Sequence, residues 1–198
     1  MELFSLENKY ILLSFVLSKT SMMKKILAFA GSNSSTSINK QLVTYASSLV
    51  ENVKVNILDL NDYEMSIYSS DREKNSGHPQ QAIDFVEQIK NSDGIIISLA
   101  EYNGAYSGAF KNIFDWVSRV EQKTFFGKPM LLMATSPGQR GGLSVLGMAS
   151  DRFPRHDANI VGKFSLPDFH KNFSDGKIIN EELNKKLVEE VKQFSESL

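Results

Sequence analysis

The stretch GIIISL at residues 94–99 is almost continuously apolar. A strand in the centre of a parallel sheet is covered on both faces, and such strands have this pattern. Four other segments are also short and rich in apolar or β-branched residues: KILAFA (25–30), VKVNIL (53–58), PMLLMAT (129–135) and NIVGKF (159–164). The sequence therefore predicts five strands, with residues 94–99 buried on both sides.

Helical patterns follow the strands. Apolar residues recur with the spacing of one helix face in four segments: 42–50, 83–89, 110–117 and 183–194. Alternation of strands and helices is typical of βαβ units and of a parallel sheet covered on both faces. Five strands fit the flavodoxin-like order better than the six-stranded dinucleotide-binding order. We therefore predict an α/β fold, a flavodoxin-like doubly wound five-stranded parallel sheet with helices on both faces.

The composition restricts the function. The chain has 198 residues, of which 41% are hydrophobic and 23% charged, with a net charge of −1, as expected for a soluble globular domain. This charge balance argues against a nucleic-acid partner, which would require a basic face. The absence of cysteine excludes disulfides, thiolate zinc sites and cysteine nucleophiles. The three histidines have no metal-ligand spacing, so we predict no metal site.

We predict one domain over residues 23–198 and an N-terminal tail over residues 1–22, either disordered or packed as a short helix. The tail contains YILLSFVL (10–17), which is too short to span a bilayer and makes a poor signal peptide after an acidic segment. Met23 offers an alternative native start, in which case the tail is an upstream artefact. We expect a cytoplasmic protein without membrane contact. Residues 68–80 are polar and turn-rich, and this predicts an exposed loop.

The loop after the first strand contains GSNSSTSIN (31–39). Ligands of doubly wound sheets bind at the carboxyl ends of the strands, near the switch in strand order. This loop lacks the glycine pattern for a dinucleotide pyrophosphate and the lysine of a nucleoside triphosphate site. Its backbone N–H groups, its hydroxyls and the following helix N-terminus suit a single phosphate. Alternatively, Ser37 only caps that helix.

Two further strand-end loops are rich in turn residues. The segment AEYNGAYSGAFKNIFDWVSR (100–119) contains the turn signal Asn103-Gly104, and glycine permits the backbone to approach a flat ligand closely. Asp115 and Arg119 are spaced for an ion pair on the helix that follows. The segment TSPGQRGGLSVL (135–146) has three glycines and a proline, which favour a shaped backbone cradle. The alternatives are a tight turn with exposed tyrosines and a flexible loop.

Together, GSNSSTSIN, EYNGAYSGAFKNIFDWVSR and SPGQRGGLSVL resemble the three signature segments of the NADPH-dependent FMN reductase family, which includes quinone, azo-dye and chromate reductases. The resemblance extends from about Lys24 to the C-terminus. It implies a flavodoxin-like fold, bound FMN as the cofactor, and NADPH or NADH as the electron donor.

The resemblance also implies an FMN site. The first loop would hold the FMN phosphate, the second would lie along the isoalloxazine, and the third would lie near the other edge of the flavin. The matching positions are Ser32, Ser37, Ile38 and Asn39 in the first loop, Glu101, Tyr102, Asn103 and Gly104 in the second, and Ser136, Gly138, Gly141 and Gly142 in the third.

The chain departs from the family pattern at two positions. Ser34 stands where the family usually carries an arginine, and Ala100 stands where it usually carries a proline. Loss of a charge-assisted hydrogen bond, each of which contributes about 1.5–3 kcal/mol, predicts weaker FMN binding unless Lys40 or another cation compensates. The alanine loosens the second loop slightly.

The implied function is that of an FMN-dependent NAD(P)H oxidoreductase, which reduces quinone, azo or flavin-type acceptors by ping-pong hydride transfer through FMN. Because the cofactor carries the chemistry, we expect no catalytic acid–base residue. Arg140 either attracts the phosphates of the nicotinamide donor or is an ordinary surface arginine. One alternative is a flavodoxin-type electron carrier without nicotinamide-dependent activity, which the net charge of −1 disfavours. Another is a flavin-free interaction protein that kept the fold.

The segment FKNIFDWVSRV (110–120) predicts an interface. Phe110, Ile113, Phe114 and Val117 form its inward stripe, whereas Trp116 points away from that stripe. An exposed tryptophan beside an apolar patch is typical of a protein contact. We therefore predict a homodimer or homotetramer with Trp116 and Arg119 at or near the interface, as the family resemblance also implies.

Overall fold

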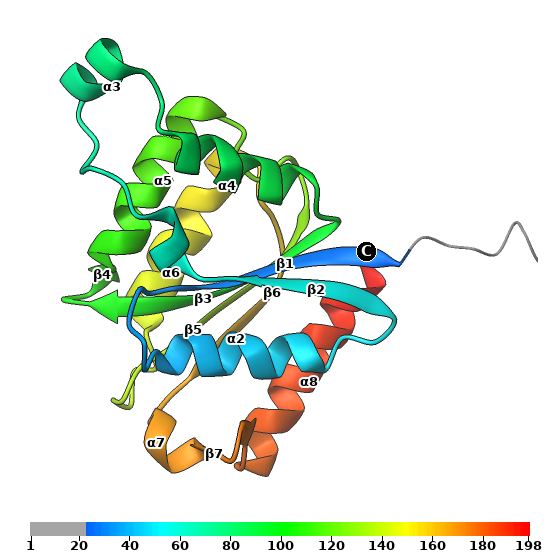
Figure 1. Cartoon of the computed structure of the whole chain (residues 1–198). Helices are drawn as coiled ribbons and strands as arrows, with labels where there is room; N and C mark the ends of the chain where they lie inside the picture. Colours follow the sequence, from blue (N-terminus) through cyan, green and yellow to red (C-terminus); the bar gives the residue numbers. More distant parts are fainter. Residues whose placement is uncertain (1–22) are drawn as a thin grey trace, which may run out of the picture.

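The predicted strands form one parallel sheet in the computed structural model, which describes residues 23–198 (Figure 1). The strand order is β2-β1-β3-β5-β6, which is the flavodoxin-like order and confirms the predicted fold. These strands are β1 (Lys24–Gly31), β2 (Val53–Leu58), β3 (Gly94–Tyr102), β5 (Pro129–Thr135) and β6 (Asn159–Leu166). A two-residue strand, β4 (Ala105–Tyr106), pairs antiparallel with the end of β3.

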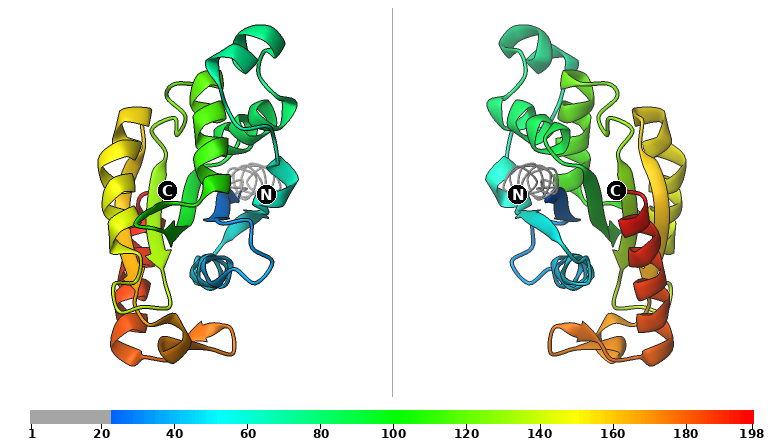
Figure 2. Two further views of the ribbon diagram at one scale, coloured as in Figure 1. Left: turned by 90° about the vertical axis from the view of Figure 1, so that its left-hand side faces the viewer. Right: turned by 90° about the vertical axis from the view of Figure 1, so that its right-hand side faces the viewer.

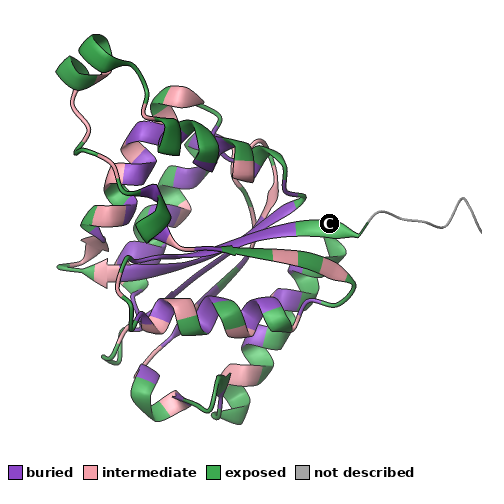
Figure 3. Ribbon diagram, in the orientation of Figure 1, coloured by how far each residue is buried: buried purple, intermediate pink, exposed green. Residues whose placement is uncertain are grey.

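Helices cover both faces of the sheet (Figures 1 and 2). One face carries α2 (Ile38–Ser48) and α8 (Glu181–Glu196), and the other carries α4 (Gln80–Lys90), α5 (Gly108–Val120) and α6 (Leu143–Arg152). Alternate residues of β1 point to opposite faces. Leu27 and Phe29 join the core beneath α4, α5 and α6, whereas Ile26 and Ala28 join the core beneath α2 and α8. The central strands β1, β3 and β5 are therefore buried over most of their length, whereas the edge strand β2 is largely exposed (Figure 3).

Short elements complete the fold. They are η1 (Leu60–Tyr63), α3 (Ser70–Ser76), η2 (Phe153–His156), α7 (Phe169–Asn172), β7 (Phe173–Ser174) and β8 (Lys177–Ile178). The predicted tail at residues 1–22 lies outside the described residues. Within residues 23–198, the helices are all too short or too polar to cross a membrane.

The loop predicted at residues 68–80 contains the helix α3, so that prediction was wrong in part. Ser69 accepts a hydrogen bond from the Arg72 backbone N–H at 3.2 Å, and the acidic residues Asp71 and Glu73 lie in the first turn. Both features stabilise a helix N-terminus. The sequence of this helix, SDREKNS, has no apolar stripe, and none of its residues is buried. It lies within a projection, here named the α3 arm (residues 66–79), which extends from the body of the molecule in Figure 1.

The α3 arm also overturns the prediction for Trp116. This side chain is only 1% exposed, and its indole Nε1 donates a hydrogen bond to the backbone oxygen of Ser66 at 2.8 Å. The Tyr68 ring packs edge-to-face on it, with centroids 5.0 Å apart. Trp116 is therefore buried by the chain's own arm, and an exposed tryptophan cannot support the predicted interface.

The predicted ion pair between Asp115 and Arg119 was also wrong. Asp115 pairs with Lys111 at 2.7 Å on the same helix, and Arg119 pairs with Glu73 of the α3 arm at 3.3 Å. Helical spacing brings Asp115 within reach of both cations, but the arm supplies a second carboxylate for Arg119. The choice of partners thus depends on a contact between distant segments.

Candidate functional site

The loops that follow β1, β3 and β5 meet at the carboxyl ends of these strands. A cavity of about 480 Å³ lies among them, at the position where doubly wound sheets bind ligands. Seven of the twelve predicted site residues line it: Ser32, Ser37, Ile38, Asn39, Glu101, Tyr102 and Ser136. The other five lie nearby in the second and third loops but are not part of the lining: Asn103, Gly104, Gly138, Gly141 and Gly142.

The first loop presents hydrogen-bond donors to this cavity. Ser37 caps α2, since its Oγ accepts from the Lys40 backbone N–H at 3.1 Å. The N–H groups of Ile38 and Asn39, in the first turn of α2, have no acceptor among residues 23–198. Such groups and the helix dipole attract an anion. Ser32, Ser34 and Thr36 also line this cavity. Capping by Ser37 is therefore compatible with binding of a phosphate.

Asn39 fixes this helix terminus to the sheet. Its side chain is buried, at 2% exposure. Its Oδ1 accepts from Ser98 Oγ at 2.7 Å and from the Thr135 N–H at 3.0 Å, and its Nδ2 donates to the Thr135 oxygen at 3.2 Å. These bonds connect α2 with β3 and β5. The side chain thus positions the loop, and the backbone N–H is the donor that remains available.

The second loop is a tight hairpin. Asn103 and Gly104 have φ values of +53° and +75°, a conformation that the Asn-Gly pair favours between two antiparallel strands. Glu101 reaches across to α6, where its Oε2 accepts from the Val145 backbone N–H at 2.9 Å. The carboxylate therefore stabilises the N-terminus of α6 and joins the second loop to the third. Tyr102 lies at the mouth of the cavity and is 55% exposed.

The third loop is packed against the end of β6. Gly141 has a φ of +56°, and a Cβ at this position would lie 2.4 Å from Ser165 Oγ, so only glycine fits. The Gly138 oxygen accepts from the N–H groups of Gly141, at 3.1 Å, and Asp168, at 3.0 Å. Residues 143–146 of the third signature segment belong to α6 rather than to the loop.

The nearby cations do not compensate for the missing arginine at position 34 in the simplest way, which would be a free Lys40 at the phosphate. Lys40 Nζ lies 2.5 Å from Asp59 Oδ2, so this lysine is already paired with a carboxylate. The hydrogen bond from Lys40, together with one from the Asn61 backbone, lowers the pKa of Asp59 to about 2. Arg140 lies outside the cavity lining and contacts Ser144 Oγ at 3.2 Å.

His170 lines the cavity, and the sequence analysis missed it. It belongs to α7, which follows β6, so it reaches the cavity from a fourth strand-end segment. The only signal in the sequence was its place after the fifth predicted strand. Residues 23–198 contain no group of three or more histidine, aspartate or glutamate side chains arranged to hold a metal ion.

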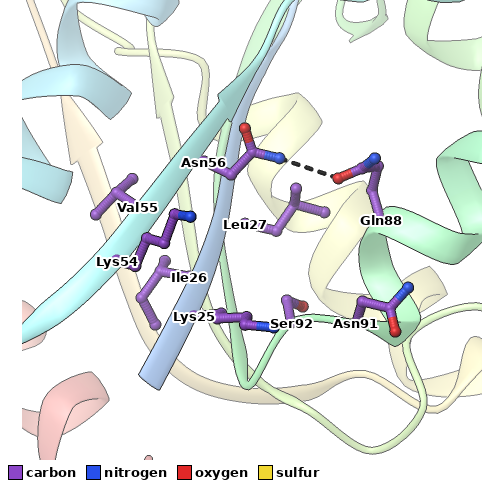
Figure 4. Close-up of a pocket in the computed structure, with 9 residues that line it drawn as sticks. All are labelled: Lys25, Ile26, Leu27, Lys54, Val55, Asn56, Gln88, Asn91 and Ser92. Carbon is purple, nitrogen blue, oxygen red and sulfur yellow. Dashed lines mark hydrogen bonds between the residues drawn. The ribbon is translucent and has the colours of Figure 1, made fainter. Parts of the chain in front are cut away.

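A second cavity of about 400 Å³ lies at the amino-terminal ends of β1 and β2 (Figure 4). Its walls come from β1, β2, α4 and the short connection between α4 and β3. One hydrogen bond, from Asn56 Nδ2 to Gln88 Oε1 at 3.0 Å, joins the side chains around it. Because it lies at the opposite end of the strands, it is a weaker candidate for the site of a doubly wound sheet.

Comparisons with known proteins identify the family and the fold of the chain. The family model for NADPH-dependent FMN reductases matches residues 24–171. A quinone reductase of Escherichia coli (strain K12) is 35% identical over 79 residues, which cover 40% of this chain and 42% of that protein. A 2-hydroxy-1,4-benzoquinone reductase of Burkholderia sp is 35% identical over 122 residues, covering 61% of this chain and 64% of that protein. The chain thus aligns with less than two thirds of the length of both relatives.

A solved structure shows the same fold. The flavoenzyme NAD(P)H:(acceptor) oxidoreductase FerB from Paracoccus denitrificans superimposes with a TM-score of 0.70, at 23% identity, over 88% of this chain and 96% of that chain. The match of the family model covers most of the chain. The chain belongs to the NADPH-dependent FMN reductase family.

Proposed function

We propose that this protein is an FMN-dependent NAD(P)H oxidoreductase that reduces small quinone, azo or flavin-type acceptors. The observation that carries the proposal is the cavity at the carboxyl ends of β1, β3 and β5, which has a phosphate-compatible helix terminus in its wall. Membership of the family supports FMN and a nicotinamide donor. The names of the two quinone reductases, and of an NADPH azoreductase from a Bacillus strain that is 32% identical over 94 residues, support the class of acceptor.

The residues of the cavity fit FMN. The hydroxyls of Ser32 and Ser37 and the N–H groups of Ile38 and Asn39 would hold the phosphate, because the donors and the helix dipole replace its water shell. The second loop (101–104) and the third loop (136–142) would hold the isoalloxazine between them. When bound, FMN supplies the hydride chemistry that connects the nicotinamide with the acceptor.

The protein's own contribution is to position the reactants. Asn39 and Glu101 hold the three loops in fixed relative positions, and the mouth at Tyr102 stays open to solvent. An open mouth suits a ping-pong cycle, in which the donor leaves before the acceptor occupies the same place. Arg140 lies in the third loop and lines a groove with Lys163, Lys186 and Glu190, and we propose that Arg140 attracts the phosphates of the nicotinamide donor.

Steady-state kinetics on the purified protein test this proposal. We expect a flavin absorbance spectrum, oxidation of NADPH or NADH in the presence of quinones or azo dyes, and parallel double-reciprocal lines. Ser37→Ala should weaken FMN binding, whereas Ser48→Ala at the other end of the same helix should not. Bound FMN without nicotinamide oxidation would indicate the electron-carrier alternative. Protein without affinity for FMN would contradict both.

We also propose that the protein is a homodimer or homotetramer. With Trp116 buried, the proposal rests on the family resemblance alone. Light scattering over a range of protein concentrations measures the mass directly. A monomer at micromolar concentration would contradict the proposal.

A further inference from the structure

The candidate FMN cavity contains few groups that can be charged. Among residues 23–198, its lining includes no lysine or arginine, one carboxylate, Glu101, and one imidazole, His170. The Glu101 carboxylate is already bound to the Val145 backbone N–H. A phosphate in this cavity therefore meets hydroxyls and helix-terminus N–H groups, and His170 is the lining side chain that can add a full positive charge.

The lysines of the adjoining segments have other partners. Lys40 of α2 pairs with Asp59, and Lys171 of α7 pairs with Asp168 at 3.4 Å. His170 is an exposed residue and forms no ion pair within the part of the chain that the structure describes. Its ring is therefore available to an anion in the cavity.

Hydrogen bonds tie the segment of His170 to the N-terminus of α2. Asn39, in the first turn of α2, bonds the backbone of Thr135 through its side-chain amide. The next residue, Ser136, accepts a hydrogen bond through its backbone oxygen from the Phe169 N–H at 3.2 Å. His170 follows Phe169 directly. It therefore lies one residue from a segment that is held beside the phosphate-compatible helix terminus.

Packing places α7 on the same face of the sheet as α2 (Figure 1). Phe169 stacks on Phe173 with centroids 4.7 Å apart, and Phe173 packs edge-to-face on Tyr45 of α2 with centroids 6.1 Å apart. The hairpin of the second loop belongs to the opposite face, because its Tyr106 packs on the core beneath α4, α5 and α6. His170 thus approaches the cavity from the face of the phosphate-compatible terminus, not from the face of the loop assigned to the isoalloxazine.

We propose that His170 contacts the FMN phosphate and that protonation of its ring strengthens FMN binding. The inference rests on the proposed function, because it requires FMN in this cavity. The protonated ring supplies the charge-assisted hydrogen bond that the first loop, with Ser34 in place of an arginine, does not provide. Imidazole changes its charge between about pH 5 and pH 8. The contribution of His170 is therefore present at low pH and is lost as the pH rises through this range.

Other charged groups on the surrounding elements balance one another. The cations are Lys40, Arg140, Lys171 and Lys177, and the anions are Glu101, Asp168 and Asp175. Ordinary carboxylates and lysine or arginine side chains keep their charge between about pH 5 and pH 8, whereas imidazole does not. A phosphate monoester itself titrates near about pH 6, so each variant must be compared with wild type at the same pH.

Flavin titrations at two pH values test this inference. Flavin-free protein of full length is titrated with FMN and with riboflavin, which has the same ring system but no phosphate. His170→Gln should weaken FMN binding about three- to ten-fold at about pH 5.5 and hardly at all at about pH 8.5. Riboflavin should bind equally well to both proteins at both pH values.

Two further variants complete the test. His170→Lys replaces the titrating ring by a cation that stays charged, and it should bind FMN several-fold more tightly than wild type at about pH 8.5. His78→Gln removes an imidazole from the α3 arm, outside the cavity lining, and should leave the titrations with both flavins unchanged. Unchanged binding of riboflavin also shows that each variant is folded.

Three results would overturn this inference alone. Equal FMN affinities of wild type and His170→Gln at both pH values would exclude the contact. Equal weakening of FMN and riboflavin binding would place the ring at the flavin and not at the phosphate. A loss of FMN affinity that is the same at both pH values would show a neutral hydrogen bond and no cation. Wild-type protein that binds neither flavin would instead overturn the reductase proposal, and this inference with it.

Discussion

The side-chain amide of Asn39 forms two hydrogen bonds with the backbone of Thr135, one through the Thr135 N–H at 3.0 Å and one through the Thr135 oxygen at 3.2 Å. The pair joins the first turn of α2 to the last residue of β5. It therefore fixes the distance between the phosphate-compatible loop and the third loop. Ser98 adds a third bond to the same amide, from the centre of the sheet.

Asn39→Ala should destabilise the protein even without FMN. The substitution leaves the Ser98 hydroxyl and the Thr135 backbone groups buried without their partner, and such groups cost about 1–3 kcal/mol each. We expect the free energy of unfolding to fall by about 2–4 kcal/mol in urea denaturation of FMN-free protein. Gln41→Ala, at an exposed position on the same helix, should have little effect. A loss of FMN binding with unchanged stability would show that Asn39 contacts the cofactor directly.

Ser34→Arg should tighten FMN binding. Lys40 is paired with Asp59, so the first loop has no cation of its own to meet the phosphate. A guanidinium there would add a charge-assisted hydrogen bond worth about 1.5–3 kcal/mol, or roughly ten-fold or more in Kd. Fluorescence titration at two salt concentrations measures the gain and its salt dependence. Ser34→Gln is the matched control, since both variants lose the bond that Ser34 Oγ accepts from the Thr36 N–H. Equal affinities of the two variants would argue against a phosphate at this loop.

Asp59→Asn should remove part of the acid sensitivity of the fold. The pKa of Asp59 falls from 3.8 to about 2 on folding. A lowered pKa contributes stability that is fully present above the unfolded value and is lost as the pH falls through the folded value. The contribution is about 1 kcal/mol or less, because the side chain is 36% exposed and solvent screens the pair.

The measurement for Asp59 is chemical denaturation from about pH 5 to pH 2. Wild type should lose this increment across the range, whereas Asp59→Asn should lack it. Asp62→Asn is the control, because Asp62 lies in η1, the short helix that Asp59 caps, and forms no ion pair within residues 23–198. If the free energy of unfolding falls by the same amount in wild type and in Asp59→Asn as the pH is lowered, the Lys40–Asp59 pair does not stabilise the protein.

Trp116→Phe should weaken the attachment of the α3 arm. The variant loses the indole hydrogen bond to Ser66 and leaves a void beside Tyr68, which together cost about 1–3 kcal/mol. We expect faster hydrogen exchange in residues 66–79 and an unchanged molecular mass. Arg119→Gln removes only the exposed pair with Glu73 and should cost less than about 1 kcal/mol. A halved mass for Trp116→Phe would instead place the tryptophan at a subunit interface.

Local patterns in the sequence were sufficient to predict the sheet and the positions of the three strand-end loops. The run at residues 94–99 is apolar because both faces of β3 are covered, and the Asn103-Gly104 pair forms a hairpin because both residues tolerate positive φ. Such signals depend on a few neighbouring residues, so they can be read without knowledge of distant contacts. The position of the cavity followed from the strand order, which the number and type of strands predicted.

Only the tertiary structure decided which distant groups meet. The burial of Trp116 depends on an arm whose helix has no apolar stripe, and Lys40 is paired by a residue that follows β2. The pairs Asn39–Thr135 and Glu101–Val145, and the common cavity of Ser37 and His170, join segments that are tens of residues apart. A polar side chain has many potential partners along a chain of this length. Topology and packing select among them, because most buried polar groups are satisfied by whatever the fold brings within about 3 Å.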